Sequence, residues 1–550
     1  MVALTLLLLL SEVVLGLQSV VIVRANFKPA PLPPVHITSD GDISDSSALI
    51  RRNGDIYTFT GNWSSTSYYL EVERSNIVID GAGFFIIGNG YQLGIDLKGV
   101  TNVKISNVNI EDRNRGFYLE NCSHVTITDC TVKGGNSGVY LNSSHNNEIS
   151  GNRLTSTFYG IYLDHSAGNI LRDNQITADS TSSYGMAFMV SGESLADYLN
   201  DIDESNLISG KPIIYWVGRQ DAVVPPDAAY VALINCRAIV VQNQQISKTQ
   251  GILVAWTTNS TVTNNSLNGN FNGIQLLQSS NIVVSENKIW ESLSLVNLNT
   301  GLEEGGDGVS IVHSQYLTVI NNHVTENRNG GITCTNSSGN QLIGNVVTRN
   351  WHNGINLVSS SNLNLIALNY VYNHTTMSLG AVFIQDSTQN QLVANNLTDN
   401  GCWAIQLQGE QGNNTFYGNN FLNNSYINAR RNRGTIQIST PGTANGNSWD
   451  NGSIGNYWSD YGSLDTNRDG VGDSPYYINP TNQDNHPLMN LVATSEVPLI
   501  APDLPSSQGV PELPVIVAFA LLAAVIAMTS VVYFKKHKPK AAEVTRSKQH

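Results

Sequence analysis

The chain has 550 residues, a net charge of −14 and only 13% charged residues. That length excludes one ordinary compact domain and favours several domains, or a repeat array that grows along one axis. A typical soluble domain has about 25% charged residues. Low charge with abundant Val, Ile and Asn disfavours helices and favours stacked strands and turns. The negative charge also excludes nucleic acid as a partner, because its phosphates would be repelled.

The first segment, residues 2–23, is largely apolar, and Val23-Arg24-Ala25 offers small residues at the usual cleavage positions. We therefore predict a signal peptide over residues 1–25. An uncleaved membrane anchor is the alternative, because the segment lacks a start rich in Lys and Arg. Both interpretations predict that the chain is exported.

Internal periodicity is the strongest pattern in the sequence. A phrase of glycine, an apolar residue, any residue and a second apolar residue recurs at 22-residue intervals and returns further along the chain. It begins at Gly94, Gly116, Gly138, Gly160, Gly251, Gly273, Gly308, Gly331 and Gly354. A second phrase with alternating apolar positions and an Asn turn follows each, as at 102–110 and 281–289. Self-similarity at such a period is typical of solenoids.

The repeat has a direct physical interpretation. Apolar residues at a spacing of two point to one side of a short strand, and Gly and Asn tolerate the left-handed backbone of a corner. One coil cannot bury its apolar side, whereas stacked coils pair every strand with the next and fill a continuous interior. Parallel crossovers favour right-handed winding, and Asn at the same turn of successive rungs can form a hydrogen-bonded ladder. The sequence therefore predicts an all-β, right-handed parallel β-helix with rungs of about 22 residues.

The C-terminal region carries a second membrane signal. Residues 515–534 form an uncharged apolar run of 20 residues, long enough to cross about 30 Å of hydrocarbon. A Pro-rich stretch precedes the run, and a basic cluster at 535–538 follows it, which disfavours a buried core helix. The positive-inside rule places the basic tail in the cytoplasm and the preceding region outside. We expect a single-pass cell-surface protein.

Cysteines and glycosylation sequons fit this location. The five cysteines are too few and odd in number for a disulfide scaffold, so buried free thiols are expected. Sequons are dense, as expected for an exported glycoprotein, although many arise by chance in a chain rich in Asn, Ser and Thr. They include Asn62, Asn121, Asn142, Asn259, Asn336, Asn373, Asn396, Asn413 and Asn423.

An acidic stretch near the C-terminus reproduces most of a calcium loop, with oxygen ligands at positions 1, 3, 5 and 9 and a backbone carbonyl at position 7. The residues are Asp465, Asn467, Asp469, Asp473 and, for the carbonyl, Val471. Position 12 is Tyr476 rather than Glu, so the closing carboxylate is expected from Asp460 or Asp484. The prediction is a structural Ca²⁺. An acidic turn held by Asx hydrogen bonds is the alternative.

Three histidines recur near one corner of adjacent rungs. His124, His145 and His165 lie 21 and 20 residues apart, and stacked imidazoles could bind copper or zinc. Their offsets from the rung glycines differ, so their register is imperfect. Histidines in a polar turn ladder are the favoured interpretation.

Carboxylates that could serve catalysis are scattered. The weak candidates are Glu111, Asp112, Arg113, Asp164 and His165, with Asp173 and Glu286 further along the chain. Glycosidases need a pair of carboxylates flanking the scissile bond, and no tight acidic signature appears here. Most of these residues are expected to be solvated turn residues, so a non-catalytic protein is favoured over an enzyme.

The rung phrases resemble those of the NosD-like family of parallel β-helix proteins, which is also grouped with carbohydrate-binding and sugar-hydrolase β-helices. Residues 75–83 look like the family's first rung, and residues 208–235 look like an insertion common in archaeal surface members. Residues 455–461 and 484–489 are similar to the terminal module, so the resemblance spans roughly residues 36–490. It implies a link to copper, which we do not carry over because the chain lacks a Met- or Cys-rich cluster.

Seven parts are predicted from these observations: a signal peptide at 1–25, an N-terminal cap at 26–75, a β-helix at 76–440 with an insertion near 190–235, an aromatic and Asp/Gly-rich C-terminal cap at 441–490, a Pro-rich linker at 491–514, a transmembrane helix at 515–534 and a cytoplasmic tail at 535–550. The function expected is non-catalytic binding of extracellular glycans or other envelope components. The alternatives are a polysaccharide lyase, hydrolase or epimerase, and a copper-handling accessory protein of NosD type.

Overall fold

A computed structural model describes residues 34–64, 69–90, 92–178, 185–296, 303–374, 379–410, 412–424, 437–440 and 446–493. These residues form an all-β solenoid of about 15 turns, which confirms the predicted stack of coils. Their only helical segment is the 3-10 helix η2, Leu195–Tyr198, and none of their helices is long and apolar enough to span a bilayer. The predicted signal peptide, transmembrane helix and tail lie outside the described residues.

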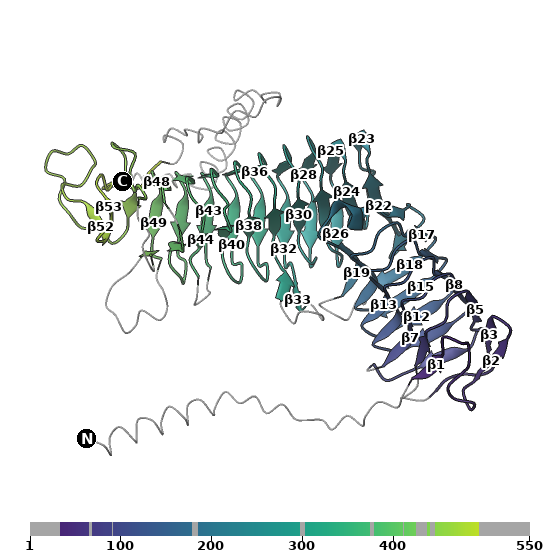
Figure 1. The fold of residues 1–550 in the computed structure, drawn as a ribbon. Helices are drawn as coiled ribbons and strands as arrows, with labels where there is room; N and C mark the ends of the chain where they lie inside the picture. Colours follow the sequence, from purple (N-terminus) through teal and green to yellow (C-terminus); the bar gives the residue numbers. More distant parts are fainter. Residues whose placement is uncertain are drawn as a thin grey trace, which may run out of the picture. The chain divides into compact units, whose positions relative to one another are not determined.

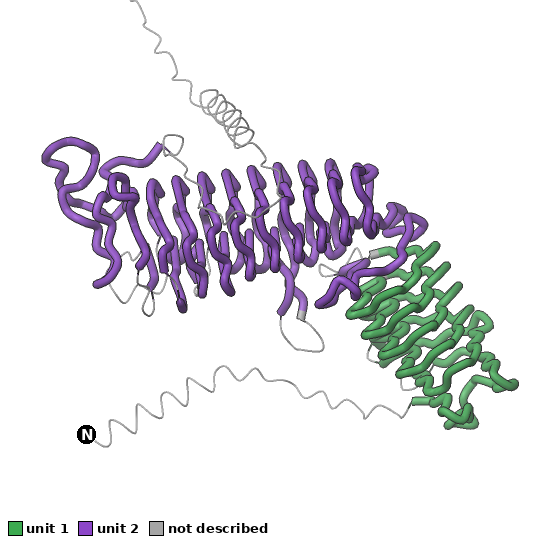
Figure 2. The backbone as a smooth tube through the Cα atoms, turned by 45° about the horizontal axis from the view of Figure 1, so that its top comes forward, with its two compact units in different colours: residues 1–179 green, residues 180–550 purple. Residues whose placement is uncertain are grey.

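The chain divides into two compact units, residues 1–179 and 180–550 (Figure 2). Unit 1 has three sheets, here called A, B and C, whose strands pair in parallel except for the β2–β3 hairpin. Sheet A comprises β1 (Val35–Ile37), β4 (Leu70–Val72), β7 (Leu93–Lys98), β10 (Arg115–Glu120), β13 (Ser137–Asn142) and β16 (Tyr159–Asp164); sheet B comprises β2 (Ile50–Asn53), β3 (Ile56–Phe59), β5 (Ile77–Asp80), β8 (Val103–Ser106), β11 (Thr126–Thr128), β14 (Glu148–Ser150) and β17 (Ile170–Arg172); sheet C comprises β6 (Phe85–Ile87), β9 (Asn109–Glu111), β12 (Thr131–Lys133), β15 (Arg153–Thr157) and β18 (Gln175–Ala178).

Unit 2 also stacks three parallel sheets, here called D, E and F (Figure 1). Sheet D comprises β22 (Lys211–Val217), β24 (Tyr230–Ile234), β27 (Ile252–Ala255), β30 (Ile274–Leu277), β35 (Val309–Val312), β38 (Ile332–Thr335), β41 (Ile355–Val358), β44 (Val382–Gln385), β47 (Ile405–Gln408) and β50 (Ile438–Ser439); sheet E comprises β23 (Gln220–Val223), β25 (Arg237–Gln242), β28 (Thr261–Thr263), β31 (Val283–Ser285), β36 (Thr318–Ile320), β39 (Gln341–Ile343), β42 (Leu365–Ala367), β45 (Gln391–Val393) and β48 (Thr415–Tyr417); sheet F comprises β26 (Gln245–Ser247), β29 (Ser266–Asn268), β32 (Lys288–Trp290), β37 (His323–Thr325), β40 (Val346–Thr348), β43 (Tyr370–Tyr372), β46 (Asn396–Thr398), β49 (Asn420–Leu422) and β51 (Tyr457–Trp458). The remaining strands of the unit are β19 (Met186–Ser191), β20 (Asp201–Ile202), β21 (Leu207–Ile208), β33 (Ser294–Val296), β34 (Glu303–Gly305), β52 (Tyr476–Asn479) and β53 (Asn482–Asp484).

The rung length is regular in most of unit 1 and variable in unit 2. From β7 to β16 equivalent residues of unit 1 lie 22 residues apart, as for Val125 and Asn147. The first rungs are longer, with 35 residues between Val35 and Leu70 and 25 between Leu70 and Ile95. In unit 2 the interval is 21 to 26 residues at most rungs. It rises to 35 between Asn287 and Asn322, because the antiparallel hairpin β33–β34 projects from the coil there (Figure 1). Part of the predicted insertion near 190–235 belongs to the stack, because β22 pairs in parallel with β24, and β24 pairs in parallel with β27 of the next rung.

A buried amide ladder runs through unit 2. Its eight members occupy the same corner of successive rungs: Asn265, Asn287, Asn322, Asn345, Asn369, Asn395, Asn419 and Asn456. Asn345 shows the pattern, since its Oδ1 accepts from the backbone N–H and the Nδ2 of Asn322. Its Nδ2 donates to Val319 O and to Asn369 Oδ1. Every polar atom of the amide therefore has a partner in an interior where an unpaired one would be costly.

The chain turns the corner at the residue that precedes each ladder Asn. Seven of these preceding residues have a positive φ: Asn264, Glu286, Asn321, Gly344, Leu368, Ala394 and Gly418. Glycine adopts that region freely, whereas Leu or Ala there costs about 1–2 kcal/mol. The Asn of the ladder is thus required for its hydrogen bonds, whereas the left-handed position before it is occupied by several residue types.

Aromatic rings end the core of unit 2. Trp449 stacks on Phe416 with 4.3 Å between ring centroids, and Trp458 stacks on Phe421 at 4.4 Å. Both indole N–H groups have acceptors, because Trp449 donates to Asn482 Oδ1 and Trp458 to Asp484 Oδ2. The two tryptophans therefore cover the last coil without burying an unsatisfied donor.

One carboxyl is buried beside sheet D. Asp307 accepts hydrogen bonds from Gly330 N at 2.8 Å and from Thr333 Oγ1 at 3.0 Å. Burial nevertheless raises its pKa to about 7, because the ionised form is poorly solvated there. A carboxyl whose pKa is higher in the folded than in the unfolded chain, where it is about 3.9, stabilises the fold below pH 4. That contribution is lost as the pH rises through about 7.

We predict that Asn345→Ala lowers the free energy of unfolding by about 2–4 kcal/mol. The substitution leaves the buried backbone N–H of Asn322 without its acceptor and removes the bonds that Asn345 Nδ2 donates to Val319 O and Asn369 Oδ1. Gln341→Ala, at an outward position of the same rung, is the control and should cost less than about 0.5 kcal/mol. Denaturant unfolding of the full chain measures both. Equal losses for the two variants would contradict a supporting role for the ladder.

We also predict that Asp307→Asn raises the thermal midpoint at pH 8 but not at pH 4. The amide keeps an acceptor for Gly330 N and removes the ionisation that costs stability at high pH. Asp221→Asn, at an exposed position of the same unit, should change neither midpoint. An equal effect of Asp307→Asn at the two pH values would rule out the pKa as its cause.

Candidate functional site

The glycine of the repeat phrase sets which side chains of sheet A point outward. A Cβ on Gly116, the second residue of β10, would lie 2.6 Å from Gly138 O and 2.7 Å from Val132 Cγ1, so only glycine fits this position. The apolar residues that follow, such as Phe117 and Leu119, are fully buried in the core. Tyr118 between them therefore faces outward, as alternation along a strand requires.

The outward positions of sheet A form one column across six strands. Parallel register aligns them rung by rung, and we call the column the acid–tyrosine face. Its members are His36, Glu71, Asp96, Tyr118, Tyr140 and Tyr162. A second row, two residues further along each strand, comprises Lys98, Glu120, Asn142 and Asp164. Carboxylates, amides and aromatic rings thus repeat at the strand spacing of about 4.8 Å.

The tyrosines stack along the column and bond to the second row. Tyr140 and Tyr162 are stacked with centroids 4.8 Å apart, and Tyr118 and Tyr140 are tilted at 5.4 Å. Tyr140 OH donates to Asp164 Oδ2 at 3.0 Å, and Asn142 Nδ2 donates to Tyr118 OH at 3.2 Å. The guanidinium of Arg115 lies 4.3 Å from the Tyr118 ring centroid and 4.8 Å from that of Tyr140. The face is therefore a preorganised polar and aromatic surface.

Acidic groups gather at the other end of the column. His36 Nδ1 lies 3.1 Å from Glu73 Oε1 and 4.0 Å from Glu71 Oε2. The Lys98 ammonium lies 3.3 Å from Glu71 Oε1 and 3.0 Å from Asp96 Oδ2. Among the described residues, His36, Glu71 and Glu73 are the one group of His, Cys, Asp or Glu whose ligand atoms all lie within 4.8 Å of one another.

Asp96 is the most shielded of these acids. Its side chain is 1% exposed, and its carboxylate contacts the Lys98 ammonium, which lies 3.0 Å from Oδ2. Burial raises the pKa of Asp96 against the opposing effect of Lys98. Burial lowers the pKa of Lys98, but its contacts with Asp96 and Glu71 outweigh this and raise it overall. Asp96 and Glu71, whose side chain is 14% exposed, thus share one ammonium.

Two of the five predicted catalytic candidates belong to this surface. Asp164 ends the second row, and His165 Nδ1 lies 2.8 Å from Asp164 Oδ1. The other three lie elsewhere: Glu111 is on sheet C, 3.8 Å from Lys133, and Asp112 is at an exposed corner. Arg113 is buried and donates to Ile87 O.

The three predicted histidines do not share a position in the rung. His145 pairs with Ser123 of the preceding rung, whereas His124 follows that serine in the chain. His165 instead follows the second row at Asp164. None of the three belongs to a metal-sized cluster of described side chains. Among histidines, the residue that sequence reasoning missed is His36.

The loop at residues 465–473 is held by hydrogen bonds of its own. Asp465 accepts from the backbone N–H groups of Asp469 and Gly470, and Asp473 accepts from Thr466 N. The expected closing carboxylates are engaged elsewhere, since Asp484 accepts from Trp458 and Asp460 accepts from Tyr476 OH. The predicted Ca²⁺, with Asn467 and Val471 among its ligands, stays a prediction.

The outward column of sheet D in unit 2 has a different chemistry. Its members are Tyr215, Ala232, Leu253, Gln275, Ser310, Thr333, Asn356, Phe383 and Gln406. It holds no acid and a single tyrosine, Tyr215, which is buried and donates to Tyr198 O. Elsewhere on the unit, Trp351 is 55% exposed with the Arg328 guanidinium 3.9 Å from its ring centroid. The stacked tyrosines and paired acids of sheet A therefore have no counterpart in this column of sheet D.

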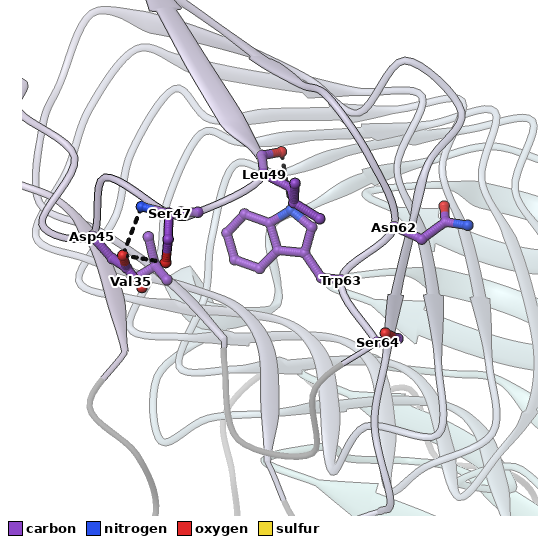
Figure 3. Close-up of a pocket in the computed structure, with 8 residues that line it drawn as sticks. Val35, Asp45, Ser47, Leu49, Asn62, Trp63 and Ser64 are labelled. Carbon is purple, nitrogen blue, oxygen red and sulfur yellow. Dashed lines mark hydrogen bonds between the residues drawn. The ribbon is translucent and has the colours of Figure 1, made fainter.

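A cavity of about 180 Å³ lies near the start of unit 1 (Figure 3). It is lined by Val35, Asp45, Ser47, Ala48, Leu49, Asn62, Trp63 and Ser64. The indole N–H of Trp63 donates to Leu49 O, and Ser47 donates to Asp45. The cavity is smaller than the roughly 300–1,000 Å³ of ligand pockets, so the acid–tyrosine face is the better candidate site. On that face Asp96, Tyr118 and Tyr140 are only 1%, 8% and 5% exposed, and Tyr162 is the half-buried ring that solvent reaches.

Most of the residues of the acid–tyrosine face that the sequence analysis missed occupy one position of the repeat. Asp96, Tyr118, Tyr140 and Tyr162 occupy the variable third position of the phrases at Gly94, Gly116, Gly138 and Gly160. The identities at that position would have located the face. His36 and Glu71 precede the first recognisable phrase, so the sequence gives no comparable sign of them.

A family model described as "Periplasmic copper-binding protein (NosD)" matches residues 75–209, 205–380 and 372–463. Cu⁺ is bound by thiolates and thioethers. The five cysteines are all buried and free, and burial raises the pKa of Cys130, Cys334 and Cys402 to about 12. Protonated thiols on separate rungs do not fit Cu⁺, whereas the nitrogen and oxygen donors at His36 suit a divalent ion.

No curated protein matches the chain. Solved structures with a similar fold include the periplasmic alginate epimerase AlgG, at 10% identity over 76% of this chain and 83% of that one, with a TM-score of 0.31. Dettilon tailspike protein gp208 matches at 14% identity over 68% and 59%, with a TM-score of 0.31. The A-module of Azotobacter vinelandii mannuronan C-5 epimerase AlgE6 matches at 12% identity over 72% and 88%, with a TM-score of 0.26. These values are too low to bear on function. The family match covers most of the repeat region, and the chain belongs to the NosD family of parallel β-helix proteins.

Proposed function

We propose that this chain is an exported surface protein that binds an extracellular glycan along the acid–tyrosine face of unit 1. The observation that carries the proposal is the register of two outward rows, one ending in three tyrosines and the other comprising Lys98, Glu120, Asn142 and Asp164. A polysaccharide repeats along its axis as the rungs do, so one sugar ring can meet each rung. Hydroxyl groups of the sugar would bond to the carboxylates and amides, and its apolar edge would contact the rings.

A purely structural role for the tyrosines is the competing explanation. Tyr118 and Tyr140 are themselves 8% and 5% exposed, but the interior is filled from the opposite side of the strands by residues such as Ile95, Val139 and Ile161. Sheet D of unit 2 stacks equally well with Gln275, Ser310 and Thr333 in the same column. The tyrosines and their hydrogen bonds to the second row are therefore additional to what stacking requires.

We predict that Tyr162→Ala weakens glycan binding at least tenfold, as expected when an aromatic anchor is lost. Tyr162 is half-buried on the face, and Tyr370→Ala on unit 2, whose ring is 41% exposed, is the matched control. The full chain is screened on a glycan array that includes neutral and uronate polymers, and affinities are measured for the best binder. Absence of binding to any polymer would refute the proposal, as would equal losses in both variants.

A second candidate function is polysaccharide modification by a lyase, hydrolase or epimerase. It is favoured by Glu71 and Asp96, which contact one ammonium while burial raises the pKa of Asp96. Two neighbouring carboxyl groups are the residue types that acid–base cleavage of sugars uses. In this case Asp96 would act as the acid and Glu71 as the base or nucleophile.

If the chain is such an enzyme, uronate polymers incubated with it gain new reducing ends, unsaturated ends or epimerised residues. Asp96→Asn should then lower the rate at least a hundredfold, in line with the usual contribution of a general acid. Glycan affinity should be retained, and Glu111→Gln on sheet C should leave the rate unchanged. An unmodified polymer at long incubation with the unsubstituted chain would remove this candidate.

A further inference from the structure

We infer that His36, Glu71 and Glu73 form a site for one divalent cation of the zinc class at the N-terminal end of the acid–tyrosine face. The three ligand atoms lie within 4.8 Å of one another, so one ion can contact all of them with small side-chain adjustments. The inference adds a metal to the face proposed for glycans. It does not depend on glycan binding.

The strands hold these ligands in place. β1 and β4 pair in parallel, with His36 directly opposite Glu71. The residues flanking both ligands, among them Ile37, Leu70 and Val72, are fully buried. Glu73 follows β4 and is fixed by a backbone hydrogen bond to Ile37 O at 2.9 Å. Ligands on packed strands are positioned more accurately than ligands on loops.

The local charge favours a cation. Glu71, Glu73 and Asp96 bring three carboxyl groups together, and Lys98 is the one ammonium in contact with Glu71 and Asp96. Lys98 approaches Oε1 of Glu71, whereas His36 lies nearer Oε2. The Oε2 side and Glu73 therefore remain for a metal while Lys98 keeps its contact with Asp96.

The donor set selects the class of ion. One imidazole nitrogen and two carboxylate oxygens suit Zn²⁺ and similar first-row ions, whereas Ca²⁺ takes six to eight oxygens. The side chains of His36 and Glu73 are 30% and 43% exposed, so the site is reachable from solvent. Three protein ligands would leave a coordination position open toward solvent, where a hydroxyl or carboxylate of a bound sugar can enter.

The competing explanation is an imidazolium held between two glutamates without any metal. The two differ in what Zn²⁺ does. A metal site saturates at one equivalent and depends on Glu73 as well as His36, whereas an ion pair adds no saturable binding.

The test uses the full-length chain in detergent, stripped with a chelator and titrated with ZnCl₂ alone by calorimetry. One saturable site is expected. His36→Ala and the isosteric Glu73→Gln should each weaken it at least tenfold, the scale on which metal sites lose affinity when their ligation is disturbed. His145→Ala, at an exposed histidine of the same unit, is the control and should bind as the unsubstituted chain does. Thermal midpoints of the four proteins verify that each is folded.

Two results would overturn the inference: no saturable Zn²⁺ binding by the unsubstituted chain, or equal binding by the His36→Ala and His145→Ala variants. Glycan affinity measured with and without Zn²⁺ separates this inference from the proposed function. Loss of the metal site alone leaves polymer binding to Tyr162 intact. Loss of polymer binding alone leaves the calorimetric site intact.

Discussion

The fold depends on one constraint: the buried amides at the corner of a rung must find their partners on the rungs above and below. The amide ladder from Asn265 to Asn456 meets this at one corner of unit 2, and Asn147 with Asn169 shows the same bonding in unit 1. Because each Asn serves both the rung before and the rung after, the ladder fixes register as well as stability. A constant register is what places equivalent side chains in straight columns.

The inward and outward columns of side chains have different roles. The inward side is aliphatic and nearly interchangeable from rung to rung, so it carries little information about function. The outward side is free to vary, and in sheet A it changes from His36 and Glu71 at one end to Tyr140 and Tyr162 at the other. A binding site on such a scaffold is therefore a property of a row and needs no pocket. This is consistent with a face that collects acids, an ammonium and stacked rings without a large cavity.

The sequence predicted the repeating part of the molecule well, because period and alternation are physical requirements of stacked strands. The phrases at Gly94 to Gly160 fall on β7, β10, β13 and β16 in register. Asn was first interpreted as a corner former, yet the left-handed positions also accept Glu286, Leu368 and Ala394. The site was harder to predict. Asp164 and His165 were among the candidates, but His36, Glu71 and Asp96 come together only through register between strands distant in sequence. Glu111 and Arg113 are close together in the chain, but neither lies on the face: Glu111 is on sheet C, and Arg113 is buried.

The most direct test of the acid–tyrosine face is hydroxyl-radical footprinting of the full chain, with and without the polysaccharide that binds it best. The account predicts protection of Tyr162 and His165 on unit 1, with Trp351 and Tyr370 on unit 2 unchanged. Protection confined to Trp351 and Tyr370 would contradict it and would move the glycan site to unit 2.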